Sequence, residues 1–401
     1  MPDSSATVPV ILFGAFDRHN FGDLLFAHVA AALLPGRELI FAGLAGRDLR
    51  PHGGHQVAAL PALARQWRGR AVNIIHAGGE ILDCDIWEAA VMLLPQDEAQ
   101  QAIAHFGPHP EARQAWAQQM LGLPTLAPYV APRTLFPQAR RVIFNAVGGA
   151  GLVQRDAAFR ADVTGTLKDA DAIGVRDMRT QAMLRQAGIA AQLMPDPAVM
   201  AAELFGGEIG RHAAAGETAD MRTAFPDGHI AVQCSADFGD EATLRAMALQ
   251  LDSIAAATGC GIALFRAGAA PWHDDLSCYA RLMAHMRSKA VRIFHSLHLW
   301  DICALLATSR CYVGSSLHGR IVAMAYALPR VNLLHPGYGG PHVKQAAYAA
   351  TWDAGLPGCT NVQSLAQVAL QAIVTSEDVR RSRAQELVRQ YRDGFSRLVE
   401  T

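Results

Sequence analysis

Cys311-Tyr312-Val313-Gly314-Ser315-Ser316-Leu317-His318-Gly319-Arg320, followed by the apolar run Ile321-Val322-Ala323-Met324-Ala325-Tyr326-Ala327-Leu328, is the stretch that decides the expected fold. Cys311 to Gly314 has the pattern of a short buried strand, and Leu317 to Leu328 has the length and alanine content of a helix. The residues between them therefore form a turn at the carboxyl end of a strand, which is where open α/β sheets place their ligands.

This turn has the features of an anion site. The first turn of a helix carries free N–H groups, and His318 would stand within it. A cap or a buried, hydrogen-bonded imidazole is the structural alternative for a single histidine at such a position. The local pattern leaves both roles open.

The same order of strand, polar turn and helix repeats along the chain. The expected strands are Val8 to Ala15, Leu39 to Gly43, Ala71 to His76, Arg141 to Val147, Ala172 to Val175, Ala191 to Met194, Ile230 to Cys234, Gly261 to Phe265, Val291 to Phe294, Cys311 to Gly314 and Pro329 to Leu334. Segments of helical length separate most of them, which predicts an α/β fold with parallel, doubly wound sheets.

A chain of 401 residues is too long for one ordinary core, so we expect two domains. The first covers 1–205 and carries a helical insertion at about 84–140. A Gly- and Pro-containing linker at 206–228 leads to a second domain at 229–375, and a C-terminal helix at 376–401 packs back across the domains.

Composition excludes several classes of partner. The formal charge is −1, with 35 Lys and Arg against 36 Asp and Glu, so neither nucleic acid nor an anionic membrane is expected as a bulk electrostatic partner. The N-terminal residues 1–7 show no targeting pattern and no apolar run approaches a bilayer span, which predicts a cytoplasmic protein without a transmembrane segment. The seven cysteines include no Cys-x-x-Cys pair, so we expect reduced thiols and no metal.

Other turns at predicted strand ends carry polar or glycine residues. They are Asn20-Phe21-Gly22-Asp23, Gly78-Gly79, Gly148-Gly149-Ala150-Gly151, Arg176-Asp177, Asp196-Pro197-Ala198 and His273-Asp274-Asp275. Each has a purely structural alternative: a closed turn, a close approach of two backbones, an ion pair at a helix end, or a solvated helix start. The last of these turns would otherwise orient a substrate or bind a metal.

Four of the turns, including the one at Ser316 to Gly319, together resemble the polysaccharide pyruvyl transferase family. The Asn20-x-Gly22-Asp23 turn is similar to the family's N-terminal signature, and Gly78-Gly79 matches its second, glycine-rich turn. Val175-Arg176-Asp177 with Asp196-Pro197-Ala198 is similar to its central segment. Ser316-Leu317-His318-Gly319 resembles its most distinctive segment, although the family commonly has arginine where this chain has Ser316.

The resemblance implies a GT-B-like pair of Rossmann-type domains facing a cleft. It also implies phosphoenolpyruvate as donor, no cofactor, and a sugar or lipid-linked oligosaccharide as acceptor in exopolysaccharide or cell-wall synthesis. A lipid-linked acceptor would bring the protein to a membrane surface. The rivals are a nucleotide-sugar glycosyltransferase or epimerase of the same fold, and an inactive family member with a binding role.

Site roles follow from the resemblance and from the needs of pyruvyl transfer. His318 is expected to be the acid/base, and Arg320 is expected to replace the missing arginine. The residues expected to bind the substrates are Asn20, Gly22, Asp23, Gly78, Gly79, Arg176, Asp177, Ser315, Ser316, Leu317, Gly319 and Lys344.

Overall fold

The computed structural model describes residues 8–335, 337 and 343–400. The N-terminal segment 1–7, for which the sequence predicts no targeting signal, lies outside the described residues. Contacts divide the described chain into two compact units. The first holds residues 8–19, 23–197 and 392–400, and the second holds residues 20–22 and 198–391.

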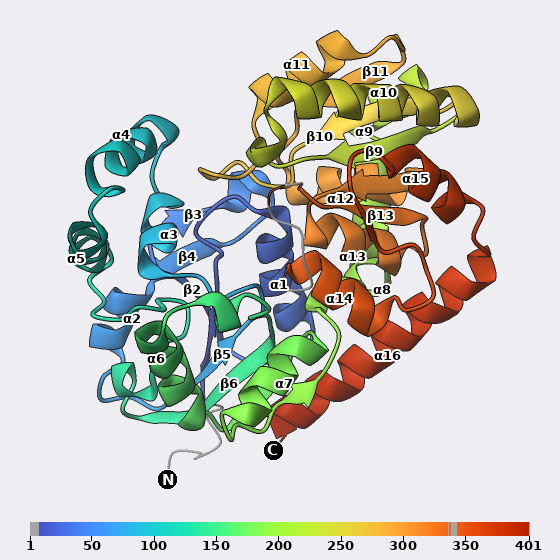
Figure 1. Cartoon of the computed structure of the whole chain (residues 1–401). Helices are drawn as coiled ribbons and strands as arrows, with labels where there is room; N and C mark the ends of the chain where they lie inside the picture. Colours follow the sequence, from blue (N-terminus) through green and yellow to red (C-terminus); the bar gives the residue numbers. More distant parts are fainter. Residues whose placement is uncertain (1–7, 336, 338–342, 401) are drawn as a thin grey trace. The chain divides into compact units, whose positions relative to one another are not determined.

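The first unit is built on an eight-stranded sheet. Its strands, in spatial order, are β3 (Arg47–Asp48), β4 (Gln56–Ala59), β2 (Leu39–Gly43), β1 (Val10–Phe13), β5 (Val72–His76), β6 (Ala139–Val147), β7 (Ala172–Val175) and β8 (Gln192–Leu193). Neighbouring strands are parallel except for the β3–β4 pair (Figure 1). The carboxyl ends of β1, β5, β6 and β7 therefore meet at one edge.

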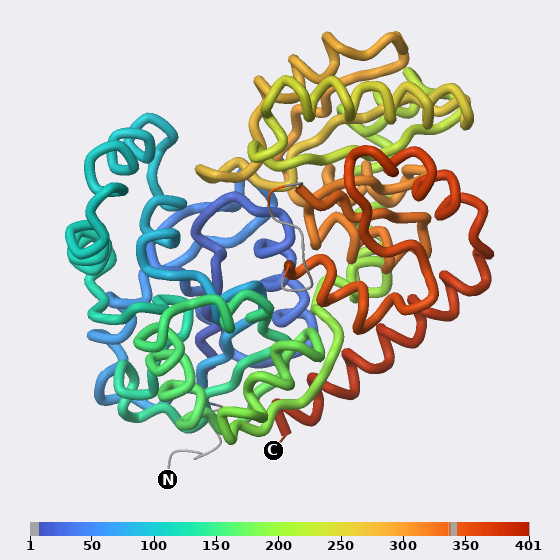
Figure 2. Tube along the Cα trace, in the orientation of Figure 1, coloured from blue at the N-terminus to red at the C-terminus, as the bar shows by residue number. Residues whose placement is uncertain are grey.

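Seven α-helices of the described chain accompany this sheet. They are α1 (Phe21–Ala32), α2 (Leu60–Gln66), α3 (Ile86–Val91), α4 (Gln96–Phe106), α5 (Pro110–Leu121), α6 (Ala157–Lys168) and α7 (Met178–Gln186). The helical insertion expected at 84–140 holds α3, α4 and α5. These three helices pack on one another through Trp87, Phe106 and Trp116 and form a lobe beside the sheet (Figure 2).

The second unit is built on a six-stranded, all-parallel sheet. Its strands, in spatial order, are β11 (Val291–Phe294), β10 (Gly261–Phe265), β9 (His229–Gln233), β12 (Cys311–Gly314), β13 (Arg330–Leu333) and β14 (Cys359–Thr360). Alternate strand residues, such as Ile230 and Val232, join one hydrophobic core with residues of the covering helices. A sheet with both faces buried produces the near-continuous apolar strands that the sequence shows.

The helices of the second unit cover both faces of this sheet. They are α8 (Ala201–Ala213), α9 (Gly216–Ala224), α10 (Glu241–Thr258), α11 (Leu276–His285), α12 (Leu299–Ala307), α13 (Leu317–Ala325), α14 (Lys344–Trp352), α15 (Leu365–Ile373) and α16 (Glu377–Glu400). Helix α10 contacts α11 and α15, whereas α12 contacts α8 and α13. The linker expected at 206–228 is instead helical, because it holds most of α8 and all of α9.

The C-terminal helix α16 ends against the first unit. Residues 392–400 are part of that unit. Arg141 of β6 donates from Nη1 to the Val399 carbonyl at 2.5 Å and from Nη2 to the Leu398 carbonyl at 2.8 Å. The expectation of a C-terminal helix that packs back is therefore met by a specific contact with the first sheet.

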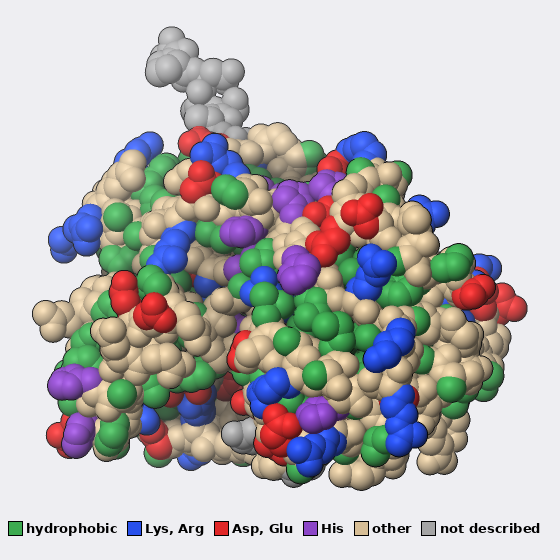
Figure 3. All heavy atoms as spheres, turned by 90° about the horizontal axis from the view of Figure 1, so that it is seen from above, with side chains coloured by type: hydrophobic (Ala, Val, Ile, Leu, Met, Phe, Trp, Pro, Cys, Tyr) green, Lys and Arg blue, Asp and Glu red, His purple; other side chains and the backbone are tan. Residues whose placement is uncertain are grey.

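Charged side chains of both signs are interspersed on the face shown in Figure 3. Among the helices that the structure describes, none has both the length and the apolar character needed to cross a bilayer.

A buried charge cluster connects α13 to β13 and to the loop after α14. Arg320 is 0% exposed, and its guanidinium pairs with Asp353 and donates to the Gly358 carbonyl at 2.8 Å. Arg330 forms a bidentate pair with the same carboxylate, at 2.9 Å from Nε and 2.5 Å from Nη2. The prediction that Arg320 reaches an anion beside His318 is therefore wrong: the side chain points into the core.

We predict that Asp353→Asn lowers the free energy of unfolding by about 3–5 kcal/mol, because it leaves two buried guanidinium groups without a charged partner. Urea unfolding of the intact chain measures the change. Asp48→Asn, which breaks the exposed pair with Arg50, should leave the midpoint unchanged. Equal midpoints for Asp353→Asn and the unaltered chain would contradict the structural role of the cluster.

Candidate functional site

The turn after β12 is held by the residues that the sequence singled out. Ser316 caps α13, because its Oγ accepts the Gly319 N–H at 3.2 Å. A Cβ on Gly319 would overlap the ring of Tyr312, so glycine is needed for the helix to approach the strand. Leu317 is buried beside it. Ser316, Leu317 and Gly319 thus shape the turn, which also carries His318.

Gln233, the last residue of the neighbouring strand β9, forms hydrogen bonds that hold this turn in place. Its Oε1 accepts the Ser316 N–H at 2.7 Å, and its Nε2 donates to Asp274 Oδ1 at 2.7 Å. Ser315 joins the same network, because its Oγ accepts the Ser235 N–H at 3.0 Å and donates to Gln233 Oε1 at 3.3 Å. The two strand ends are therefore connected by side chains as well as by the sheet.

The carbonyl groups of the turn are also satisfied. The Ser316 carbonyl accepts from Tyr312 Oη at 2.8 Å and from Asn332 Nδ2 at 3.2 Å. Gln345 of α14 donates from Nε2 to the Ser315 carbonyl at 2.5 Å. Lys344, the first residue of α14, therefore adjoins a residue that contacts the turn.

His318 is mostly buried, with 8% of the residue exposed. Its ring meets the ring of Phe21 edge to face, with centroids 6.3 Å apart. Phe21 lies in the short segment 20–22 of the second unit, where Asn20 bridges to Gly268. A Cβ on Gly22 would overlap the His318 ring, and Asn20 Oδ1 accepts the Gly22 N–H at 3.1 Å. Asn20 therefore closes the turn, and Gly22 makes room for the histidine.

Two backbone N–H groups of this turn are not free to bind an anion, although the sequence predicts an anion site here. The N–H groups of Ser316 and Gly319 are occupied by Gln233 and by the Ser316 hydroxyl. Arg266 follows β10 at the same edge of the sheet and acts electrostatically on Asp274, a contribution that the sequence pattern did not indicate. Arg320 is paired with Asp353 in the core, so it supplies no free cation to this edge.

In the first unit, Gly78 and Gly79 follow β5 in conformations that favour glycine, with φ of 109° and 93°. Gly79 forms a parallel bridge to Val147, and its carbonyl accepts the Gly148 N–H at 2.8 Å. The glycine pair thus extends the β5–β6 pairing beyond the regular strands. It places Glu80 beside the end of β6, where Glu80 Oε1 accepts the Ala150 N–H at 2.7 Å.

Arg176 and Asp177 follow β7 and have separate partners. The Arg176 guanidinium is buried, donates to Asp196 Oδ2 at 2.7 Å and pairs with Glu80. Asp177 caps α7, because its Oδ1 accepts the Thr180 N–H at 2.8 Å. The Arg176–Asp196 ion pair explains why these two residues lie at this distance in the sequence: one follows β7 and the other follows β8. With Glu80 after β5, the pair joins the ends of three strands.

Asp23 is part of the first unit, near the end of β1. Arg18 Nη2 lies 4.0 Å from Asp23 Oδ2, and Arg18 Nη1 donates to Tyr129 Oη at 2.6 Å. Burial raises the pKa of the Tyr129 hydroxyl well above its usual value, so tyrosine remains a neutral partner of Arg18. Arg18 and Tyr129 are further residues that the sequence pattern did not single out.

The structure distributes the predicted site residues over two sheet edges. The carboxyl edge of the first sheet holds Asp23, Gly78, Gly79, Arg176 and Asp177, and the second unit holds Asn20, Gly22, Ser315, Ser316, Leu317, His318, Gly319 and Lys344. Gln233 could have been found from the sequence, since it is a polar residue directly after the apolar run Ile230 to Val232. The sequence pattern leaves a helix start, substrate orientation or metal binding open for His273-Asp274-Asp275. The helix start belongs to Asp275, whose carboxylate accepts the Ser277 N–H at 2.8 Å.

Comparison with solved structures identifies the fold class. The chain resembles UDP-GlcNAc 2-epimerase from Methanocaldococcus jannaschii, with a TM-score of 0.53, 10% identity and coverage of 92% of this chain and 94% of that one. The enzyme from Neisseria meningitidis gives a TM-score of 0.51, 10% identity and 94% coverage of both chains. A putative UDP-N-acetylglucosamine 2-epimerase from Listeria monocytogenes gives 0.51, 12% identity, and 95% and 91% coverage. These similarities confirm the predicted GT-B-like fold.

The family follows from the sequence itself. The model of the polysaccharide pyruvyl transferase family matches residues 118–335, which is more than half of the chain. The chain therefore belongs to the polysaccharide pyruvyl transferase family and is a transferase. The comparison with curated protein sequences finds no significant match.

Asp274 provides a test of the network around the turn. Burial raises the pKa of this carboxyl to about 7, although Ala267, Gln233 and Gly268 donate to it. Because the folded chain holds a proton that the unfolded chain releases near pH 4, stability should fall as pH rises from about 4 to about 7, on the order of 1 kcal/mol per pH unit. Asp274→Asn should lack this contribution.

The measurement is the difference in unfolding free energy between the unaltered chain and Asp274→Asn, determined at several pH values between about 4 and 7. Asp275→Asn is the matched control, because hydrogen bonding to Ser277 lowers the pKa of Asp275 and its contribution is lost toward acid pH instead. A difference for Asp274→Asn that stays constant between pH 4 and 7 would show that Asp274 is ionised throughout.

Proposed function

We propose that the protein transfers the pyruvyl group of phosphoenolpyruvate to a sugar of a surface polysaccharide or its lipid-linked precursor, forming a pyruvate ketal. The observation that supports this most is the family match over 118–335, which includes the turn that presents His318 at the carboxyl edge of the second sheet. The chemistry assigned to that turn is acid/base catalysis.

Ketal formation requires protonation of the donor's methylene carbon, which leaves an oxocarbenium-like centre at the adjacent carbon. A sugar hydroxyl adds to that centre and loses its proton, phosphate leaves with the electrons of its C–O bond, and a second hydroxyl adds and loses its proton to complete the ketal. One proton balances the one taken up by carbon, and the other is released with the phosphate. Proton transfer is therefore needed both to carbon and from oxygen. An imidazole performs both at neutral pH, which is the role proposed for His318.

The donor also carries a phosphate and a carboxylate, which need fixed cationic partners. Arg176 and Arg320 are already paired with buried carboxylates. We therefore assign Arg266 and Lys344 to the donor. Arg266 acts electrostatically on Asp274, which Gln233 connects to the His318 turn, and Lys344 precedes Gln345, which donates to the Ser315 carbonyl. Asp23 is proposed for the acceptor hydroxyls, with Arg18 holding its carboxylate.

Incubating the purified chain with phosphoenolpyruvate and a mixture of glycan and lipid-linked oligosaccharide acceptors tests this function. Acceptor-dependent release of phosphate and a gain of one pyruvyl mass on the acceptor are expected. Conversion of a UDP-sugar without phosphate release would instead favour an epimerase or glycosyltransferase. Binding of phosphoenolpyruvate without turnover on any acceptor would favour an inactive member with a binding role.

We predict that His318→Gln lowers turnover by about 10²–10⁴-fold while the melting temperature and the donor dissociation constant change little. Glutamine retains a hydrogen-bonding side chain of similar size but transfers no proton at neutral pH. Steady-state phosphate release, calorimetric binding of phosphoenolpyruvate and thermal melting measure the three quantities. His105→Gln, at an exposed position of α4, is the control. Normal turnover in His318→Gln, or a loss proportional to unfolding, would remove His318 from catalysis.

A further inference from the structure

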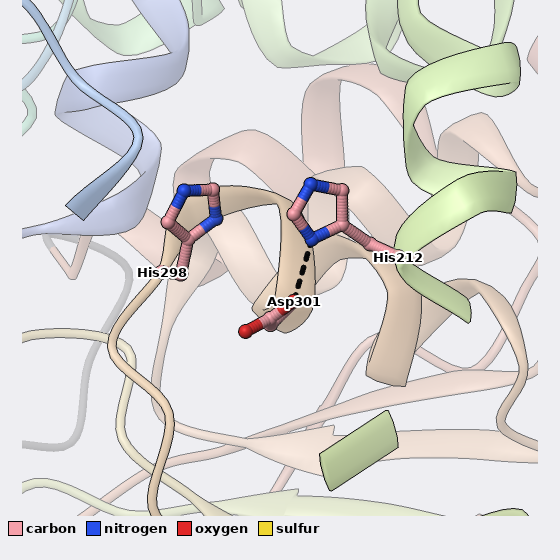
Figure 4. A group of neighbouring side chains, drawn as sticks. All are labelled: His212, His298 and Asp301. Atoms are coloured by element: carbon pink, nitrogen blue, oxygen red, sulfur yellow. Dashed lines mark hydrogen bonds and ion pairs between the residues drawn. The ribbon is translucent and has the colours of Figure 1, made fainter. Parts of the chain in front are cut away.

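Three potential metal ligands meet at one end of the α8–α12 pair. His212 lies in the last turn of α8, His298 is the N-cap residue of α12, and Asp301 lies in the first turn of α12. One ligand atom from each of these side chains lies within 4.8 Å of the other two. Figure 4 shows the two imidazoles side by side with the carboxylate next to them, and the rings stack with centroids 4.9 Å apart.

The spacing suits one small cation. His212 Nδ1 and Asp301 Oδ1 are 2.6 Å apart. In a tetrahedral zinc site, bond lengths of about 2.0–2.2 Å separate neighbouring ligand atoms by roughly 3.3 Å. Insertion of a metal would therefore move this pair apart by less than about 1 Å, within the reach of a rotation about the side-chain bonds.

Outer contacts already hold the ligands. His212 Nε2 lies 3.3 Å from Glu208 Oε1, so a second carboxylate stands beside the ring nitrogen opposite the one that contacts Asp301. Ser296 Oγ donates to Asp301 Oδ2 at 2.6 Å. This arrangement of carboxylate, histidine and a hydrogen-bonded ligand carboxylate is the outer shell typical of metal sites.

The backbone around the cluster is held in place as well. Glu217 of α9 accepts the N–H groups of His295 and Ser296 at 2.7 Å each, which fixes the segment that leads from β11 to His298. Phe205 of α8 packs on Trp300 of α12, with ring centroids 5.0 Å apart. The three ligands therefore lie on segments whose backbone or packing is fixed by other residues. Two of them, His298 and Asp301, lie shortly after the carboxyl end of β11.

We infer that His212, His298 and Asp301 form a binding site for a divalent transition-metal ion of the zinc class. Two imidazole nitrogens and one carboxylate oxygen match the N and O ligands of zinc, and a three-ligand site leaves a fourth position for water or a ligand group. The sequence predicts no metal, because the cysteines lack a zinc spacing. This cluster uses none of them and draws its ligands from two separate parts of the chain.

The test is titration of the chelator-treated, full-length chain with Zn²⁺ by calorimetry and with Co²⁺ by visible absorption. The unaltered chain should bind one ion of each at the cluster, and Zn²⁺ should raise its melting temperature. His298→Gln should weaken this site by more than about 10-fold, as expected for loss of a direct ligand. Asp301→Asn should do the same while keeping a side chain able to bond to Ser296.

His285→Gln is the matched control. His285 pairs with Glu241 at 2.8 Å and its side chain is exposed to a similar degree, 27% against 25% for His212, but among the described residues no third ligand joins that pair. Its loss should leave the Zn²⁺ affinity unchanged. The inference is overturned if the unaltered chain binds no Zn²⁺, if His298→Gln and Asp301→Asn both fold and bind as tightly as the unaltered chain, or if His285→Gln weakens binding equally.

Discussion

Burying a guanidinium group is costly unless its charge and its N–H groups find partners, and in both units of the protein carboxylates supply them. In the first unit, Arg176 joins Glu80 and Asp196, which follow different strands. In the second, Arg320 and Arg330 share Asp353. Each cluster connects elements that are distant in the sequence. In both clusters the arginine side chains are almost fully buried, with at most 3% of the side chain exposed.

These buried pairs explain which part of the site the sequence could predict. Strand, turn and helix at 311–328 follow from local apolar pattern, so the position of His318 in the first helical turn was predictable. Arg320 is a candidate to replace the missing arginine because it lies one short step further along the same helix. Positions 316 and 320 are four residues apart, a spacing that places side chains on the same face of a helix, so the helical period does not argue against this role. The sequence does not show that the Arg320 guanidinium is buried and paired with Asp353.

Other parts of the site depend on the spatial order of the strands, which local pattern does not determine. Gln233 and the Ser315-Ser316 turn lie about 80 positions apart but meet because β9 and β12 are neighbours. The cluster of His212, His298 and Asp301 depends in the same way on the packing of α8 against α12. In the sequence alone, none of these residues lies near its partners. The order of the strands brings Gln233 to the turn, and the packing of α8 on α12 brings the three residues of the other cluster together.

Ser316 provides a helix cap at a position where the family resemblance implies an arginine. A serine at this position caps α13 through its own hydroxyl and has its N–H held by Gln233. An arginine, as the family resemblance leads one to expect here, supplies a cation but no N-cap oxygen. With serine, the turn gains a fixed geometry and loses a charge. If phosphoenolpyruvate is the donor, as proposed, its phosphate and carboxylate need cations other than a side chain at position 316. Arg266 after β10 and Lys344 at the start of α14 are the cations proposed for this role, because the Arg320 guanidinium is already paired with Asp353.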